Sequence, residues 1–444
     1  MPHVTFIYPS VGRFNGSKYI RSWQMQPLAI AALSSLTPKS WNKSFFDDRV
    51  EPVNFDVKTD LVAISIESFT ARRGYQIAHE YRKRGIPVVM GGYHATFCPE
   101  EVLEHADAVC VGEAEGVWPS ILKDAEQHKL SGKYVVINKE ASFSCNYDRS
   151  IFLLKNYFRL ALVETGRGCS YNCSFCSISA FHKGRCKYRP VEEVVNEISN
   201  LQEKVVFFVD DNITCQHGRA KELFTALKVL NIQWIGQADI KVATDPQLLD
   251  IMVQSGCVGL LIGFETIGCD SLSYINKHVN RTVDYSEGLK ELRKRGIAVY
   301  GTFLLGLPND SQESLKKSLK FAIEEKLFIA AFNHIIPFPG TPLYKDFQET
   351  NRLIYDKWWL SEEYRFGEAP FNPQCASSSQ LQEWCHNARK EFYSIPSIMR
   401  RLVDFNANCN SARKITSYLG INLLLRKEIT QRKGLPLGEQ PVTY

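Results

Sequence analysis

Cys169, Cys173 and Cys176 form a C-x₃-C-x₂-C pattern in the sequence Gly-Cys-Ser-Tyr-Asn-Cys-Ser-Phe-Cys. Thiolates are the usual protein ligands of iron–sulfur clusters, and three of them could hold three corners of a 4Fe–4S cluster. Because no fourth cysteine lies in the same turn, one iron would stay open to a ligand that is not protein. The pattern therefore predicts a cluster that binds and reduces a small molecule, since electron carriers normally close all four corners.

Zinc is the main alternative for these thiolates. Zinc in structural sites takes four protein ligands, and His182 or Cys186 could supply the fourth. Disulfides are not expected, because 13 cysteines without regular pairing are typical of reduced thiols. Three further cysteines are expected to be small buried hydrophobic residues, namely Cys215, Cys257 and Cys269.

The cysteine motif resembles the cluster motif of the radical S-adenosylmethionine (SAM) superfamily. In that superfamily the open iron chelates SAM, and an electron from the cluster cleaves SAM to a 5′-deoxyadenosyl radical. Further stretches match the superfamily in order, at residues 205–212, 259–266, 300–308 and 337–344. The resemblance implies that Asp210 and Asp211 lie near the amine of SAM, and that Glu265 and Thr266 lie near its ribose. From the residues alone, the two aspartates could instead cap the turn that follows.

Residues 1–130 show how an N-terminal domain would be built. Apolar stretches alternate with helical ones, and the expected strands are Val4–Tyr8, Ser44–Asp47, Leu61–Ile66, Val88–Gly91 and Ala108–Val111. Such alternation predicts a doubly wound parallel sheet covered on both faces, and ligands of these sheets bind beyond the carboxyl ends of the strands. Candidate binding residues at those ends are Ser65, Gly91, Gly92, His94, Gly112 and Glu113. Gly91-Gly92 could equally be only a tight turn.

The sequences at 91–96 and 106–115 are similar to the cobalamin-binding domain of one radical SAM subfamily. This resemblance implies that the six residues bind cobalamin. The D-x-H-x-x-G motif, whose histidine coordinates cobalt in other cobalamin proteins, is absent. The motif therefore does not identify a lower axial ligand of cobalt in this chain. His94 is expected to contact the cofactor without ligating cobalt.

The rest of the chain continues the α/β pattern and then changes. Residues 131–159 are expected to be a connector, with a possible strand at Tyr134–Ile137. Over residues 160–340, six strand–helix units predict a partial (β/α)₆ barrel with its site at the mouth, and helices are expected to open near Pro190, Gly218, Pro246, Thr282 and Ser311. Residues 341–444 are mainly helical and rich in aromatic residues, which more often form core than a cap over a substrate.

Composition narrows the function classes. A hydrophobic content of 44% with 23% charged residues is ordinary for a globular protein. The net charge of +5 is spread along the chain without a basic stripe, so no nucleic-acid partner is expected. No apolar run approaches the roughly 20 residues of a membrane helix, and no secretory signal is recognised at the N-terminus. We therefore expect a cytoplasmic protein with a small-molecule substrate and a flavodoxin- or ferredoxin-like reductant.

Together the two resemblances imply a cobalamin-dependent radical SAM enzyme, most simply a methyltransferase acting on an unactivated carbon of a small molecule or natural product. One alternative is a related enzyme without methyl transfer, such as an oxidative cyclase or one that transfers another part of SAM. A methylthiotransferase is disfavoured, because Cys98, Cys110 and Cys145 do not match the positions of its second cluster. A non-enzymatic cofactor carrier is disfavoured by the complete set of SAM-site stretches.

Overall fold

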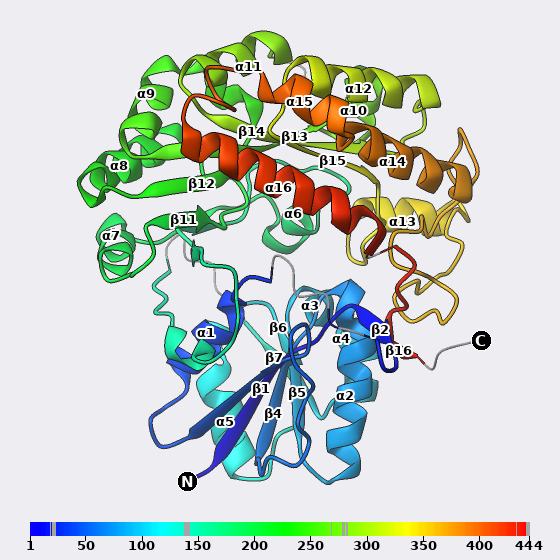
Figure 1. The fold of residues 1–444 in the computed structure, drawn as a ribbon. Helices are drawn as coiled ribbons and strands as arrows, with labels where there is room; N and C mark the ends of the chain where they lie inside the picture. Colours follow the sequence, from blue (N-terminus) through cyan, green and yellow to red (C-terminus); the bar gives the residue numbers. More distant parts are fainter. Residues whose placement is uncertain are drawn as a thin grey trace.

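The computed structural model describes residues 1–17, 19, 24–136, 143–267, 269–277, 280, 283–431 and 433–440. Two sheets follow one another along the chain and form two stacked bodies (Figure 1). The first is a parallel sheet in the order β3-β1-β4-β5-β6-β7. Its strands are β1 (His3–Tyr8), β3 (Asn42–Asp47), β4 (Leu61–Ser65), β5 (Val88–Gly91), β6 (Ala108–Val111) and β7 (Gly132–Val135).

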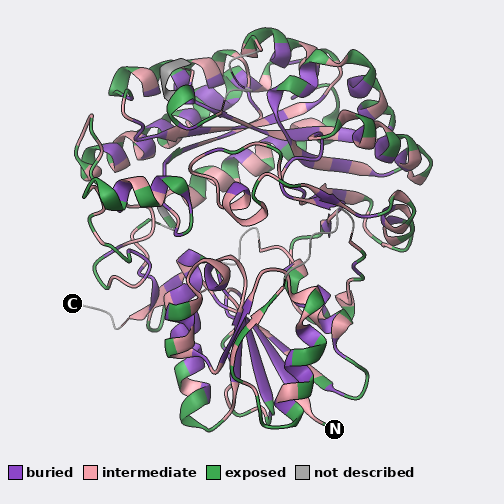
Figure 2. Cartoon of the chain, turned by 180° about the vertical axis from the view of Figure 1, so that it is seen from behind, coloured by how far each residue is buried: buried purple, intermediate pink, exposed green. Residues whose placement is uncertain are grey.

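Helices cover both faces of this first sheet, because alternate residues of its strands point to opposite sides. Leu61 and Ala63 pack with α1 (Leu28–Leu36) and α5 (Trp118–Glu126) on one face. Val62 and Ile64 pack with α2 (Ala71–Lys83) and α4 (Pro99–His105) on the other. The short helix α3 (Tyr93–Phe97) follows β5. The inner strands β1, β4, β5 and β6 are consequently buried over most of their length (Figure 2), as the apolar runs predict, whereas the edge strands β3 and β7 carry exposed residues.

The second sheet is the predicted partial barrel. Its six parallel strands run in the order β15-β14-β13-β12-β11-β8, so β8 and β15 are its edges in the described part of the chain. The strands are β8 (Ala161–Val163), β11 (Val205–Phe208), β12 (Gln233–Ala238), β13 (Cys257–Glu265), β14 (Ala298–Leu305) and β15 (Ile329–His334).

Helices on the outer face of the barrel begin close to where the sequence predicts them. They are α7 (Val191–Ser199), α8 (His217–Leu227), α9 (Pro246–Gln254), α11 (Tyr285–Lys294) and α12 (Gln312–Glu324), with the shorter α10 (Cys269–Tyr274) before α11. Local capping explains the starts: Asp245 accepts the Leu248 N–H at 3.0 Å, and Ser311 accepts the Ser314 N–H at 3.1 Å. The predicted helix start at Thr282 and the strand end at Ile137 lie outside the described residues.

The C-terminal part packs on both bodies. It contains α13 (Pro342–Glu349), α14 (Ser378–Phe392), α15 (Ile395–Leu402), α16 (Ala412–Gln431) and β16 (Gly438–Gln440). Leu381 and Phe392 of α14 join the barrel core, whereas Trp358 and Trp359 join the core of the first sheet. These aromatic residues are core, so the simpler of the two expectations for them is correct. The division at residues 130, 160 and 340 stays a prediction.

The end of the chain returns to the first sheet. β16 pairs in parallel with β2 (Gly12–Phe14), and the two lie side by side in Figure 1. Glu439 forms ion pairs with Arg13 and with Arg73, at 2.8 Å for Arg73. Arg73 also holds Asp48, which is fully buried, through two nitrogens at 2.9 and 3.0 Å. Among the described helices, none combines the length and apolar character needed to span a membrane.

Candidate functional site

A cavity of about 280 Å³ lies between the carboxyl ends of the two sheets. One wall comes from α1 and the loops after β4, β5 and β6, and the other comes from the loops after β8 and β11. The structure thus brings together six residues predicted from distant parts of the sequence. They are Ser65, Gly91, Gly92, Gly112, Glu113 and Asp211.

The two glycines after β5 differ in what they require. Gly92 has a φ of +103°, and a Cβ there would lie 2.5 Å from the carbonyl oxygen of Ile66. Only glycine fits such a position without moving the neighbouring backbone. A Cβ on Gly91 would make an ordinary 3.5 Å contact with Cys110. Gly92 is therefore fixed by the tight turn, while Gly91 is the position where a larger side chain would test the cavity.

His94 does not line the cavity. Its ring is fully buried, with Nδ1 3.2 Å from Ser68 Oγ and Nε2 3.1 Å from Glu101 Oε1. Burial would raise the pKa of Glu101, but hydrogen bonds from His94, Trp359 and Lys357 outweigh it and lower the pKa to about 2. His94 therefore joins α3 to α4 and to the C-terminal segment. Its predicted contact with a cofactor is not supported by this placement.

The three cluster cysteines lie on the loop between β9 (Gly166–Arg167) and α6 (Ser177–His182), at the barrel mouth. All three are free thiols. β9 pairs with β10 (Lys187–Tyr188) in a short antiparallel ladder beside this loop. In the described parts of the chain, no three His, Cys, Asp or Glu side chains converge closely enough for one metal ion.

Gly168 fixes the start of the cluster loop. Its φ is +87°, and a Cβ there would lie 2.1 Å from the carbonyl oxygen of Arg185. Its N–H donates to Asp211 Oδ2 at 2.8 Å. The backbone before Cys169 is consequently held between Arg185, which precedes β10, and Asp211, which follows β11.

Two cysteines outside the motif lie beside it. Cys186 and Cys215 have their sulfurs 3.6 Å apart, and Cys215 Sγ accepts the Ser170 N–H at 3.3 Å. The prediction that Cys215 is a buried hydrophobic residue is wrong, because it is partly exposed and hydrogen-bonded. The same prediction holds for Cys257, which is buried. The side chain of Cys269 lies outside what the structure describes.

Asp210 and Asp211 point in different directions. Asp210 is buried, and its two oxygens accept the Thr165 N–H at 2.7 Å and the Thr165 hydroxyl at 2.5 Å. Burial raises the pKa of Asp210 to about 7. Asp211 instead lines the cavity, and burial raises its pKa to about 6. Asp210 therefore ties β11 to β8, and Asp211 is the member of the pair that can meet a ligand.

Glu265 and Thr266 lie at the carboxyl end of β13 and are buried. Glu265 has a φ of +62°, a backbone conformation that is unusual for a side-chain-bearing residue. It forms an ion pair with Lys277, which also donates to the Gly263 carbonyl at 3.0 Å. Burial raises the pKa of Cys173, and the nearby positive charge of Lys277 opposes that rise. These residues therefore lie beside the cluster loop and outside the residues that line the cavity.

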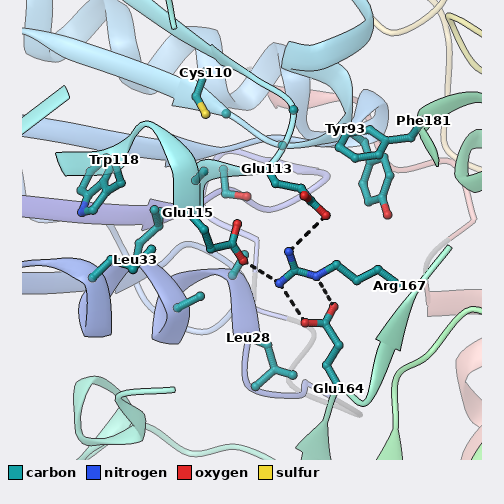
Figure 3. A pocket seen from close by; sticks show the side chains of 18 of the residues that line it. Leu28, Leu33, Tyr93, Cys110, Glu113, Glu115, Trp118, Glu164, Arg167 and Phe181 are labelled. Atoms are coloured by element: carbon teal, nitrogen blue, oxygen red, sulfur yellow. Dashed lines mark hydrogen bonds and ion pairs between the residues drawn. The ribbon is translucent and has the colours of Figure 1, made fainter. Parts of the chain in front are cut away.

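An ion-pair cluster in the cavity wall was not predicted from the sequence (Figure 3). Arg167 meets Glu113, Glu115 and Glu164 there, and Lys187 pairs with Glu113 at 2.6 Å. Burial would raise the pKa of Glu113, but Lys187 and Arg167 outweigh it and lower the pKa. The available signal was the run Glu-Thr-Gly-Arg-Gly directly before the first cluster cysteine.

The remaining wall is apolar and aromatic. Leu28 and Leu33 of α1 and Trp118 of α5 form one end of it, and Tyr93 and Phe181 form another (Figure 3). The rings of Tyr93 and Phe181 are 4.9 Å apart between centroids, so α3 of the first body touches α6 of the second. The cavity therefore has an apolar side and a charged wall, and it meets the residues that flank the cluster loop, Arg167 before it and Phe181 after it.

Comparison with known proteins gives two family matches. The model of the radical SAM superfamily matches residues 163–322, and that of the B12 binding domain matches residues 44–122. The first match covers the cluster cysteines and the second covers the loops after β4, β5 and β6.

Relatives match over most of their lengths. The chain is 28% identical over 394 residues to bacteriochlorophyllide d C-12(1)-methyltransferase of Chlorobaculum tepidum, covering 85% of this chain and 84% of the relative. It is 29% identical to bacteriochlorophyllide d C-8(2)-methyltransferase of the same organism, covering 74% and 78%. It is 25% identical to the anaerobic magnesium-protoporphyrin IX monomethyl ester cyclase of Cereibacter sphaeroides, covering 88% and 70%.

Two solved structures share the fold. The methyltransferase TsrM from Kitasatospora setae, with cobalamin and a 4Fe–4S cluster bound, superposes with a TM-score of 0.64 at 15% identity, covering 86% of this chain and 85% of that one. The cobalamin-dependent enzyme OxsB, with aqua-cobalamin and SAM bound, gives a TM-score of 0.65 at 16% identity, covering 97% and 72%.

Proposed function

The chain belongs to the cobalamin-dependent radical SAM enzymes, and we propose that it transfers a methyl group to an unactivated carbon of a small organic substrate. The observation that carries the proposal is the cavity between the two bodies, because it is lined both by the loops that we assign to cobalamin and by Asp211, which we assign to SAM. Methyl transfer needs both cofactor sites to open on one space. The two bacteriochlorophyllide methyltransferases support it, since each matches most of this chain.

The residues of the chain fit the three cofactors of the family. Cys169, Cys173 and Cys176 would hold a 4Fe–4S cluster, because they are free thiols at the barrel mouth. We assign the SAM amine to Asp211 and the SAM ribose to Glu265 and Thr266 at the end of β13. Glu265 could turn toward a ligand only by exchanging its ion pair with Lys277.

Cobalamin would lie against the loops of the first body. We assign it to Ser65, Gly91, Gly92, Gly112 and Glu113, which line the cavity together. Glycines let the backbone approach a flat cofactor closely, and Leu33 and Trp118 offer an apolar groove beside them. When bound, the cofactors supply the methyl group, the reducing electron and the radical that removes a hydrogen atom from the substrate.

The protein's own contribution is to orient these groups and to keep water out. Asp211 would present a carboxylate to the cationic SAM at neutral pH, because its pKa is about 6. Tyr93 and Phe181 close the contact between the two bodies at the edge of the cavity. We also propose a flavodoxin- or ferredoxin-like reductant and no nucleic-acid partner.

A non-methylating reaction is the second candidate, and the similarity to the magnesium-protoporphyrin cyclase favours it. The products distinguish the two. The protein is reconstituted anaerobically with iron, sulfide and cobalamin, reduced, and supplied with SAM labelled in its methyl group. Tetrapyrroles are the first substrates to offer, because they are the substrates named for these relatives.

S-adenosylhomocysteine together with 5′-deoxyadenosine and a labelled product identifies a methyltransferase. 5′-Deoxyadenosine without S-adenosylhomocysteine identifies the alternative and refutes the proposal. The control replaces Cys169, Cys173 and Cys176 by alanine, which should remove the cluster absorption and all SAM cleavage. A full cluster in that variant would show that the ligands are assigned wrongly.

A further inference from the structure

Arg167 connects the two bodies through ion pairs in the cavity wall (Figure 3). It binds the Glu164 carboxylate with two nitrogens, at 3.0 Å from Nε and 2.9 Å from Nη2. The same guanidinium is 2.6 Å from Glu115 Oε1 and 3.3 Å from Glu113 Oε1. Glu113 and Glu115 follow β6 of the first sheet, while Glu164 follows β8 of the second. One side chain therefore holds both sheets.

The contact between the loop after β6 and the loop after β8 depends on Arg167 because of the charges around its side chain. Its side chain and those of Glu113, Glu115 and Glu164 are only 15 to 25% exposed. The three carboxylates face two cations, Arg167 and Lys187. Without Arg167, Lys187 would still pair with Glu113, but Glu115 and Glu164 would lose the cation that the structure gives them. Like charges in such poorly hydrated surroundings repel strongly, so the loop after β6 would shift relative to the loop after β8.

The backbone of Arg167 leads directly into the cluster loop. Gly168 follows it and is held by Asp211 and by its close packing on Arg185, and Cys169 comes next. The guanidinium also lies 4.2 Å from the centre of the Phe143 ring. A displacement of the loop after β6 is therefore transmitted through Arg167 to the first cluster ligand, while Lys187 of β10 holds Glu113 from the side.

We propose that Arg167 is a positioning residue that fixes the loop after β6 against the cluster loop and so couples SAM cleavage to methyl transfer. This inference rests on the proposed function. Each loop stays anchored in its own sheet without Arg167, so both cofactors should still bind. Their separation would be altered, and a misplacement of about 1 Å can cost on the order of a hundredfold in rate.

The test compares Arg167→Gln, which removes the charge, with Arg167→Lys, which keeps the charge but loses the fork. Arg295→Gln is the matched control, because Arg295 pairs with Asp250 and Glu291 at 2.7 and 2.8 Å on the outside of the barrel. The quantity measured is the ratio of 5′-deoxyadenosine to methylated product. We expect it to rise at least tenfold in Arg167→Gln, to rise less in Arg167→Lys, and to stay at the parent value in the control.

A spectroscopic measurement tests the same inference without turnover. Electron paramagnetic resonance of the loaded protein, with cob(II)alamin and reduced cluster present together, reports the magnetic coupling between them. We expect that coupling to change in Arg167→Gln and to be partly restored in Arg167→Lys. An unchanged coupling and an unchanged product ratio in Arg167→Gln would overturn the inference.

Failure of the function and failure of the inference are distinguishable. If the parent enzyme makes no methylated product, the proposed function fails, and the magnetic coupling alone decides the role of Arg167. If Arg167→Gln does not retain both cofactors, the two measurements on Arg167→Lys decide, with parent values again overturning the inference.

Discussion

Replacing Gly168 by alanine should strongly impair assembly of the cluster, although the substitution adds only one methyl group. A Cβ at this position would lie 2.1 Å from the Arg185 carbonyl oxygen and 3.1 Å from His182 Cγ. With alanine, the Arg185 carbonyl cannot stay in its position, and the φ of +87° at residue 168 is strained. The loop that carries Cys169 must therefore move.

The cost can be worked from two contributions. An L-residue in the left-handed region costs about 1–2 kcal/mol. Moving the Gly168 N–H away from the Asp211 carboxylate, which it meets at 2.8 Å, loses a hydrogen bond to a charged group worth about 1.5–3 kcal/mol. Together about 2.5–5 kcal/mol would oppose the loop conformation that presents Cys169.

The assay is anaerobic reconstitution with iron and sulfide, followed by determination of iron and sulfide per chain and the cluster absorption. We expect Gly168→Ala to hold well under half of the parent's cluster. The matched control is Gly218→Ala in α8, because a Cβ on Gly218 meets nothing within 4 Å. The control should assemble a full cluster. A parent-like cluster in Gly168→Ala would refute the reasoning about this loop.

Three further outcomes follow from buried charges. Because the pKa of Asp211 is about 6, its carboxylate is ionised above that pH, so the affinity of the parent for SAM should weaken as the pH falls from 7 to 5. Asp211→Asn should bind SAM more weakly than the parent, with an affinity that does not change with pH. The same pH dependence of SAM affinity in Asp211→Asn as in the parent would contradict the assignment. His94→Ala should lower the thermal midpoint, because removing this buried hydrogen-bond partner costs about 1–3 kcal/mol of folding free energy. The electron paramagnetic resonance lines of bound cob(II)alamin should show no nitrogen triplet splitting in either the parent or this variant. Triplets that are present in the parent and lost in His94→Ala would show that the histidine ligates cobalt. Arg73→Leu should cost about 1.5–3 kcal/mol, because it removes the two hydrogen bonds of Arg73 to the buried Asp48 carboxylate, which then keeps only its weaker contacts with Arg13 and Ser10. Thermal unfolding of the apo-protein should show a lower midpoint, and a parent-like midpoint would contradict the stabilising role given to Arg73.

Much of the fold could be predicted because it depends on local patterns. Short apolar strands separated by amphipathic helices have few stable arrangements other than covered parallel sheets. Helix starts were marked by caps such as Asp245 and Ser311. The cluster cysteines also stand close together in sequence, so their joint role could be recognised before any contact was known.

Side-chain direction at the strand ends could not be predicted in the same way. Asp210 and Asp211 are adjacent, yet Asp210 is bound by Thr165 and only Asp211 lines the cavity. His94 has the sequence surroundings of a ligand loop but turns into a network with Glu101 and Trp359. In both cases the partner that decides the direction lies on another element.

What the sequence determined by itself were the two sheets and the loops that carry the site, since both follow from residue types at short spacing; the cofactor class was implied by the resemblance of those loops to a known family. Only the tertiary structure decided which residues face the shared cavity and what joins its walls. Arg167 meets Glu113 and Glu115 from about fifty positions away, and Glu439 reaches Arg73 from the opposite end of the chain. The physical reason is that an ion pair depends on distance in space, and that distance is set by how the two sheets pack and not by separation along the chain.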